Sequence, residues 1–198
     1  MTTAILLLAA GNSARMGAPK QLLSFDNKPL VRHTAEIALA AQCGPVVAVL
    51  GANEALVRDA LKGLDVETAF NARWSEGIGT SIQTGLSSPT VRNADAVILL
   101  LADQPHVSSA FLQQLVEQHR QTAKPIVAAQ YAGTAGVPAL FARSTFAKLT
   151  SLKPDEGCKK LILAHPQDSL LIDYPEAATD IDTPEDYARV IAEGANHE

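Results

Sequence analysis

The chain has 198 residues, of which 47% are hydrophobic, and its formal net charge at pH 7 is −5. The acidic balance argues against binding to bulk nucleic acid or to an anionic membrane surface, because both partners need a basic protein face. No apolar run is long enough to span a membrane, the N-terminus lacks the basic start of a secretory signal, and two distant cysteines make no disulfide framework, so we expect a cytoplasmic protein.

The first predicted element is a buried strand at residues 4–8, an apolar run without polar alternation. It leads into the small residues 9–11 (Ala-Ala-Gly), which two cations, Arg15 and Lys20, follow. Small residues let a ligand approach the backbone, whose N–H groups can point at an anion. Arg15 supplies a planar fork of donors and Lys20 a mobile point charge. The loop predicts a triphosphate site, although its spacing is not that of the P-loop motif, and a strand-to-helix turn with solvated cations is the alternative.

Strand-like and helix-like segments then alternate along the chain. The predicted strands are 46–50, 66–69, 96–101 and 126–129, and the predicted helices are 29–42, starting with Pro29, 53–63, 79–86 and 108–122. Residues 131–141 and 169–173 are predicted as further strands, the former joined to the sheet by a hairpin, and helix 184–194 follows Thr183 as its N-cap. This alternation predicts an α/β fold, a Rossmann-like three-layer αβα domain whose mostly parallel sheet has a small antiparallel part.

One carboxylate follows a predicted central strand and is a candidate metal ligand. Asp103 comes just after residues 96–101, and ligands of open α/β sheets bind beyond the carboxyl ends of the strands. Mg²⁺ prefers oxygen ligands and commonly uses one or two carboxylates together with substrate phosphates. Taken alone, Asp103 is almost equally typical of a turn or a helix cap.

Four segments of the chain resemble the nucleotidyltransferases of the molybdenum-cofactor group, the cytidylyl- and guanylyltransferases of molybdopterin. In chain order they are LAAGNSARMGAPKQLL at 8–23, NARWSEGIGTS at 71–81, LADQP at 101–105 and DIDTPED at 180–186. The resemblance implies the fold of the nucleotide-diphospho-sugar transferases. It also implies one nucleotidyltransferase domain over 1–198, with a nucleotide-binding half at about 1–105 and an acceptor-binding half at about 106–198.

The resemblance also implies a reaction and its residues. CMP would pass from CTP to molybdopterin with release of pyrophosphate, with Mg²⁺ as the cofactor. The implied catalytic residues are Arg15, Lys20 and Asp103; the nucleotide-binding residues add Ala9, Ala10, Gly11, Gly79 and Ser81; the metal ligands are Asp103 and Asp182, with Asp180 as the weaker alternative. A helix beginning near Thr80 would add N–H donors for the nucleotide.

The acceptor is expected on the second half of the chain together with the segment at 71–74. The implied acceptor residues are Asn71, Trp74, Gly136, Asp155 and Lys159. Trp74 fits a pocket wall and the core equally well. Residues 155–160 resemble a family turn, but Lys159 replaces its arginine and loses the bidentate fork, which leaves the acceptor open. Cys158 is expected to be a buried thiol.

CTP is favoured over GTP by the sequence LAAG at 8–11, where guanylyltransferases have LAGG, and by the segment 74–81. The alternatives are GTP as the donor, a sugar or polyol phosphate as the acceptor, and a non-catalytic nucleotide-binding accessory protein of a molybdoenzyme. The expected partners are therefore CTP or GTP, a molybdopterin-type acceptor and a molybdoenzyme or its chaperone, with neither nucleic acid nor membrane.

Overall fold

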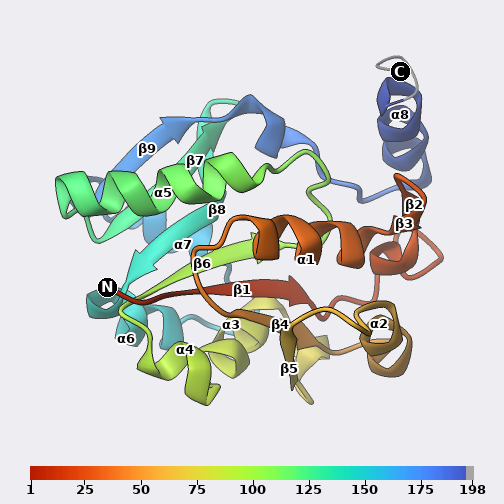
Figure 1. Cartoon of the computed structure of the whole chain (residues 1–198), viewed down its shortest axis with the longest axis horizontal. Helices are drawn as coiled ribbons and strands as arrows, with labels where there is room; N and C mark the ends of the chain where they lie inside the picture. The colour runs from red at the N-terminus through yellow and green to blue at the C-terminus, as the bar shows by residue number, and fades with distance from the viewer. Residues whose placement is uncertain (195–198) are drawn as a thin grey trace.

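A seven-stranded sheet with the order β5-β4-β1-β6-β8-β7-β9 forms the centre of the computed structural model, which describes residues 1–194 (Figure 1). The strands are β1 Thr3–Ala9, β4 Val46–Leu50, β5 Val66–Phe70, β6 Ala96–Leu101, β7 Ile126–Tyr131, β8 Thr134–Ala142 and β9 Ser169–Asp173. Strand β8 runs antiparallel to both of its neighbours, whereas every other pair in this sheet is parallel. The predicted mostly parallel sheet with a small antiparallel part is confirmed.

Helices cover both faces of the sheet. They are α1 Leu30–Ala40, α2 Glu54–Ala60, α3 Ile78–Ser87, α4 Pro89–Asn93, α5 Ser109–Thr122, α6 Phe146–Thr150, α7 Cys158–Ala164 and α8 Pro184–Gly194. Helices α1, α2 and α5 pack on one face, and α3, α4, α6 and α7 pack on the other. None of the described helices is long and apolar enough to cross a membrane.

The two cores explain why the central strands are continuous apolar runs. In β1, Ile5 and Leu7 point into the core under α1 and α5, while Leu6 points into the core under α3. Successive side chains of a strand face opposite sides, so a strand covered on both faces needs an apolar residue at every position. The same alternation holds in β6, where Ile98 and Leu99 belong to opposite cores.

Differences from the predicted elements lie in short segments and at element ends. Residues 131–141 are not one strand: β7 continues to Tyr131, a turn at residues 132–133 follows, and β8 begins at Thr134. Pro29 was expected in the first turn of α1, but it ends the short hairpin formed by β2 Ser24–Phe25 and β3 Lys28–Pro29, and α1 begins at Leu30. Helices α4, α6 and α7 were not predicted, because five to seven residues contain too few repeats to establish a helical period.

A third, small core joins the two ends of the chain. Met16 from the loop after β1, Phe25 and Leu30 pack with Ile181 and Val190. This cluster places the C-terminal helix α8 beside the β2–β3 hairpin (Figure 1). It thereby brings the segment before α8 next to the loop after β1.

Helix α8 begins with a reciprocal cap. The N–H of Asp186 donates to Oγ1 of Thr183 at 3.2 Å, and the N–H of Thr183 donates to Oδ2 of Asp186 at 3.0 Å. This is the arrangement of a capping box, with aspartate in place of the usual glutamate. The predicted N-cap role of Thr183 is confirmed, and the cap fixes the chain direction just after Asp182.

Candidate active site

The candidate site lies where β1 and β6 end. These strands pair in parallel, with Leu8 opposite Leu101, so the loop after β1 and Asp103 leave the sheet at the same edge. The N–H of Ile181 donates to the carbonyl oxygen of Asp103 at 3.1 Å. Three segments that are distant in the sequence therefore meet at the carboxyl ends of the strands, the position expected for a ligand site in an open α/β sheet.

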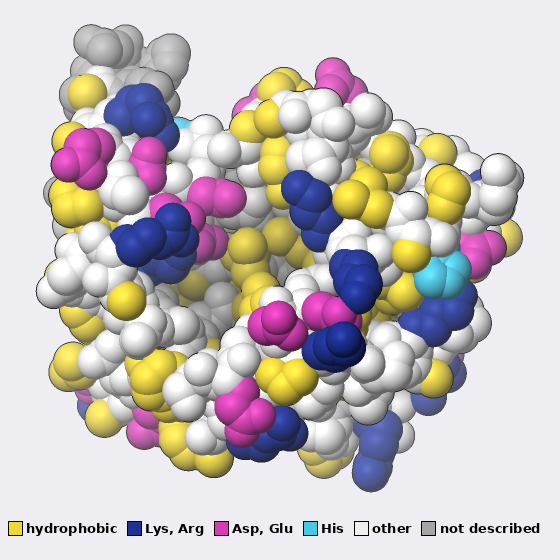
Figure 2. Space-filling model, turned by 180° about the vertical axis from the view of Figure 1, so that it is seen from behind, with side chains coloured by type: hydrophobic (Ala, Val, Ile, Leu, Met, Phe, Trp, Pro, Cys, Tyr) yellow, Lys and Arg dark blue, Asp and Glu magenta, His cyan; other side chains and the backbone are white. Residues whose placement is uncertain are grey.

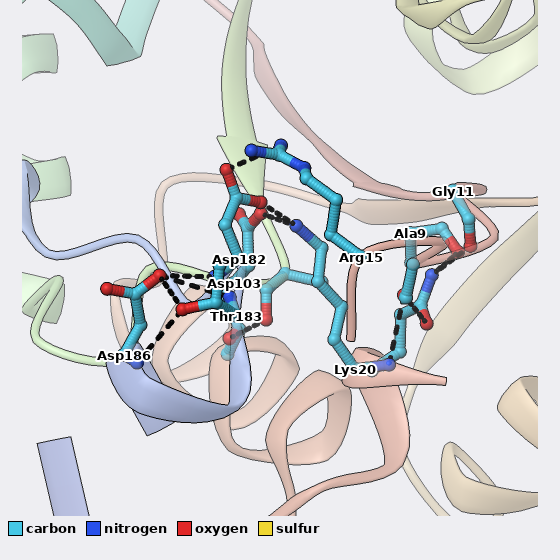
Figure 3. A network of polar contacts seen from close by, with 12 residues as sticks. Ala9, Gly11, Arg15, Lys20, Asp103, Asp182, Thr183 and Asp186 are labelled. Atoms are coloured by element: carbon cyan, nitrogen blue, oxygen red, sulfur yellow. Dashed lines mark hydrogen bonds and ion pairs between the residues drawn. The ribbon is translucent and has the colours of Figure 1, made fainter. Parts of the chain in front are cut away.

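The two predicted cations and the two predicted metal ligands form one cluster (Figure 3). The ammonium of Lys20 donates to Oδ2 of Asp103 and, at 2.9 Å, to Oδ1 of Asp182. Nη2 of Arg15 donates to the other oxygen of Asp182 at 2.8 Å. The side chains of Lys20 and Asp103 are 18% and 13% exposed, whereas that of Arg15 is 73% exposed. In this structure the cations therefore neutralise carboxylates, and Lys20 does so almost out of contact with water.

The opposite charges of this cluster favour the ionised form of one another. Burial alone would lower the pKa of Lys20, but the charges and hydrogen bonds of Asp103 and Asp182 outweigh it and raise that pKa above its ordinary value. Burial alone would raise the pKa of Asp182, but Lys20 and Arg15 outweigh it and hold that pKa below its ordinary value. The ammonium of Lys20 and the carboxylate of Asp182 are therefore both charged at neutral pH.

Asp180 lies beside the cluster in a different environment. Its Oδ1 is buried and has no hydrogen-bond partner among the described residues, and the same is true of Oδ1 of Asp103. Burial, followed by the negative charges of Asp103 and Asp182, raises the pKa of Asp180 to about 6. Asp180 is thus the most weakly stabilised carboxylate of the group, while Asp103 keeps an oxygen free to bind a cation.

The donor set fits a hard divalent cation that also keeps other ligands. Within residues 1–194 no three His, Cys, Asp or Glu side chains are grouped to hold a metal ion. Asp103 and Asp182 nevertheless share one cation, the ammonium of Lys20, so they lie close enough to share another. Two carboxylates are the usual protein contribution to an Mg²⁺ site completed by phosphates and water.

A cavity of about 450 Å³ opens beside this cluster. Its lining includes Leu8, Ala9, Ala10, Gly11, Asn12, Lys20, Gln21, Trp74, Ser75, Gly77, Ile78, Ser81, Leu101, Ala102 and Asp103. Figure 2 shows a hollow on this side of the molecule, with hydrophobic side chains at its floor and charged side chains around it. An apolar floor with a few polar groups at the rim is typical of a small-molecule site.

In the loop after β1 the carbonyls of residues 9–11 are bonded to other groups of the protein. The carbonyls of Ala9 and Gly11 accept hydrogen bonds from Nε2 of Gln21 at 3.2 and 2.6 Å, and that of Ala10 accepts from the N–H of Ala52 at 3.0 Å. Within the described part of the chain, the N–H groups of residues 11–15 make no hydrogen bond. The contribution of Gln21 could not be predicted from the sequence, because its side chain reaches back to residues ten and twelve positions earlier.

The segment between β5 and α3 supplies the opposite wall. Trp74 lines the cavity and also packs against the core under α3, so it is both a pocket wall and part of the core. Ser81 lines the cavity as well. Asn71 is only 2% exposed, and its amide is bonded inside the protein: its Nδ2 donates to Oγ1 of Thr80 at 2.9 Å and to Oγ of Ser81 at 3.0 Å. The predicted acceptor residue Asn71 therefore fixes the start of α3 and the hydroxyl of Ser81.

Of the three predicted glycines, Gly11 lines the cavity, whereas Gly79 and Gly136 lie outside its lining. The N–H of Gly79 donates to the carbonyl of Pro154 at 2.8 Å, and a Cβ on this glycine would lie 2.1 Å from the carbonyl oxygen of Lys153. Its close approach is thus to the chain before α7, not to a nucleotide. The N–H of Thr80, expected as a free donor, binds the carbonyl of Gly77 at 3.2 Å. Gly136 leaves room for the ring of Tyr131, whose hydroxyl would lie 2.3 Å from a Cβ there.

The remaining acceptor residues also lie outside the cavity. Asp155 and Lys159 are exposed, and Lys159 belongs to the first turn of α7, so the turn expected at 155–160 extends only to residue 157. The backbone of Asp155 lies against the cavity residue Gly77, where a Cβ would be 2.9 Å from the Cα of Asp155. Burial raises the pKa of the Cys158 thiol to about 12, as expected for an inert thiol.

Comparison with known proteins identifies the family. Nicotine blue oxidoreductase of Paenarthrobacter nicotinovorans is 35% identical over 116 residues, which cover 58% of this chain and 56% of that protein. The purine catabolism protein PucB of Bacillus subtilis (strain 168) is 28% identical over 205 residues, which cover 93% of this chain and 94% of that protein.

A crystal structure of Rv0371c from Mycobacterium tuberculosis H37Rv in complex with manganese is 29% identical and has a TM-score of 0.76, covering 97% of this chain and 99% of that one. The family model described as "MobA-like NTP transferase domain" matches residues 5–169, which include the loop after β1, the cavity and Asp103. The chain therefore belongs to the MobA-like NTP transferase family.

Proposed function

We propose that this protein transfers CMP from CTP to a molybdopterin-type acceptor, with Mg²⁺ or a similar divalent ion as the cofactor and pyrophosphate as the second product. The observation that carries the proposal is the Lys20 ammonium between Asp103 and Asp182, at the rim of a cavity whose loop offers unused N–H donors. Triphosphate binding needs such donors, and divalent-ion binding needs such carboxylates.

Asp103 and Asp182 would hold the metal ion, and the manganese in the related mycobacterial structure supports a divalent ion here. When bound, the ion would neutralise charge on the phosphates during the transfer. The free Oδ1 of Asp103 supports this assignment. Asp180 is a poorer ligand, because its raised pKa means that it carries a proton more readily than its neighbours.

The cations of the cluster, Lys20 and Arg15, are proposed to stabilise the negative charge of the reacting phosphates. A phosphate oxygen of the acceptor attacks the α-phosphorus of CTP in line, and the bond from that phosphorus to the bridging oxygen of pyrophosphate breaks. Phosphoryl chemistry of this kind depends mainly on positioning and on stabilising charge. Lys20 and Arg15 both adjoin the carboxylates and carry mobile cationic ends. We expect both to move onto the β- and γ-phosphates, where they stabilise the charge of the leaving pyrophosphate.

The cavity wall favours a pyrimidine base. A Cβ on Gly51 would lie 2.6 Å from both the carbonyl oxygen of Ala10 and Cβ of Trp74, so these two cavity residues are packed around this glycine. The methyl group of Ala10 is absent in the LAGG loop of guanylyltransferases. We propose that this methyl, which packs beside Gly51, narrows the wall against a larger purine.

The acceptor is proposed to enter from the half of the chain at about 106–198. The segment 153–157 lies against Gly77 and Ile78, which line the cavity, and it is the part of this half in contact with them. A sugar or polyol phosphate would reach the same place, and the assay below distinguishes these acceptors from molybdopterin.

A pyrophosphate-release assay tests the proposal. The purified protein would be mixed with CTP or GTP, Mg²⁺ or Mn²⁺, and molybdopterin, a sugar phosphate or a polyol phosphate. We expect release only with CTP, a divalent ion and the molybdopterin acceptor, and its loss in Asp103→Asn but not in the exposed control Asp173→Asn. Release with GTP alone would overturn the choice of donor. Nucleotide binding without release from any acceptor would favour the accessory role.

A further inference from the structure

The side chain of Gln21 lies under the loop that the proposed function assigns to the nucleotide. Gln21 belongs to the 3-10 helix Lys20–Leu22 and is 2% exposed. Its Nε2 donates to the carbonyls of Ala9 and Gly11, and its Oε1 accepts from the hydroxyl of Ser13 at 3.3 Å. Both ends of this buried amide are therefore bonded to the same loop, in a stretch of chain whose residues 11 and 12 are themselves exposed.

These bonds determine the direction of the loop's N–H groups. In a trans peptide the N–H of one residue points opposite to the carbonyl of the preceding residue. Holding the carbonyl of Gly11 toward Gln21 therefore turns the N–H of Asn12 away from Gln21. The carbonyl of Ala9 orients the N–H of Ala10 in the same way. The polarity that suits the loop for an anion thus depends in part on the side chain of Gln21, which itself carries no charge.

The same network also reaches the catalytic cation. The hydroxyl of Ser13 that donates to Gln21 accepts the backbone N–H of Lys20 at 3.0 Å. Ser13 has a φ of 58°, a left-handed conformation that a residue with a Cβ adopts at a cost. The backbone of Lys20 is therefore hydrogen-bonded to the bend of the loop, which fixes the position from which the Lys20 side chain extends.

We propose that Gln21 is a positioning residue that pre-orders the loop at residues 9–15 for a nucleoside triphosphate. This inference rests on the proposed function, because the triphosphate is the ligand for which the loop is ordered. A loop held in its binding conformation loses less conformational entropy when the ligand binds. Ala9 is held in the sheet by its pairing with Leu50, but without the amide the carbonyl of Gly11 is free to turn toward the cavity and repel phosphate oxygens.

The test uses Gln21→Met, which keeps the length of the side chain and removes its donors. Gln83 provides a matched control outside the cavity lining, because its amide also bridges two carbonyls, those of Thr150 and Leu152 at 3.2 and 2.8 Å. Calorimetric titration with CTP in Mg²⁺ is expected to show binding about tenfold weaker or worse in Gln21→Met and unchanged in Gln83→Met. Amide hydrogen exchange is expected to accelerate in Gln21→Met alone at Met16 and Lys20, whose N–H groups are bonded to Ser13.

The outcomes separate this inference from the proposed function. If the wild-type protein binds neither CTP nor GTP, the proposed function fails and the inference fails with it. If the wild type binds CTP and Gln21→Met binds it equally well, only the inference is overturned. Should Gln21→Met not fold, Ser13→Ala removes two contacts of the same network at a half-buried position, those with Oε1 of Gln21 and with the N–H of Lys20. Unchanged CTP binding and unchanged loop exchange in that variant would then overturn the inference.

Discussion

The ammonium of Lys20 lies 2.9 Å from a carboxylate oxygen of Asp182, although 162 positions separate the two residues in the chain. The same ammonium donates to Asp103. One flexible cation therefore occupies the place between two carboxylates that a divalent ion would take. Under the proposed function a metal ion would compete with Lys20 for this place, and phosphates would draw Lys20 out of it.

The first prediction concerns Lys20→Ala. Removing a cation that stabilises leaving charge is expected to lower the rate of nucleotidyl transfer by about 100-fold or more. The same variant is expected to bind Mn²⁺ more tightly than the wild type when no nucleotide is present, because the competing ammonium is gone. Electron paramagnetic resonance of free Mn²⁺ measures this affinity. Lys28→Ala, which removes the ion pair with Glu36, is the control and should change neither quantity. Weaker Mn²⁺ binding in Lys20→Ala would contradict the metal assignment.

The second prediction concerns the pH dependence of stability without divalent ions. The ordinary pKa of an aspartate is 3.8 and that of Asp180 is about 6, so between these values the folded protein binds more protons than the unfolded chain. The contribution of Asp180 to the free energy of unfolding therefore decreases as the pH rises through this range. Asp180→Asn cannot ionise and is expected to be more stable than the wild type above about pH 6.5, by up to about 2 kcal/mol after allowance for solvent screening.

Urea unfolding near about pH 4 and about pH 7.5 measures this difference. The gain of Asp180→Asn over the wild type should be present at the higher pH and small at the lower pH. Exposed Asp173→Asn serves as the control and should show no such pH dependence. An equal gain of Asp180→Asn at both values would show that the charge of Asp180 is not the cause.

The third prediction concerns Asn71, which the structure assigns to the start of α3. Asn71→Ala leaves the buried hydroxyls of Thr80 and Ser81 without their amide donor and is expected to lower the free energy of unfolding by about 1–3 kcal/mol. Because Ser81 lines the cavity, the KM for the nucleotide should rise more than the KM for the acceptor. Asn93→Ala, at an exposed position on α4, is the control. A rise confined to the acceptor KM, with unchanged stability, would instead restore the acceptor role first assigned to Asn71.

Asp103 could be predicted from the pattern of the sequence, whereas Asp182 could not. The strand before Asp103 is buried on both faces, so it is a continuous apolar run, and its end marks the ligand edge of the sheet. Asp182 was found only through the family resemblance, because its proximity to Asp103 depends on the packing of Ile181 and Val190 with Met16.

Gln21 and Asn71 show why other parts of the site could not be predicted. Each contributes a buried amide whose partners are determined by the path of the folded chain. Gly79 was expected to let a nucleotide approach closely. Its missing side chain instead makes room for the carbonyl oxygen of Lys153. Residue type alone does not distinguish close approach to a ligand from close approach to the protein's own backbone.

The last prediction tests the choice of base at Ala10, and it rests on the proposed donor. Ala10→Gly removes the methyl group that packs beside Gly51 and Trp74, so the wall opens by the volume that distinguishes the LAAG loop from LAGG. One methyl in a binding pocket changes discrimination by about tenfold or more, and we expect the ratio of CTP to GTP affinity to fall by about that factor. Calorimetric titration with each nucleotide in Mg²⁺ measures the ratio. Ala52→Gly removes the same methyl from a neighbouring buried position outside the cavity lining and should leave the ratio unchanged. An unchanged ratio in Ala10→Gly would mean that this wall does not select the base.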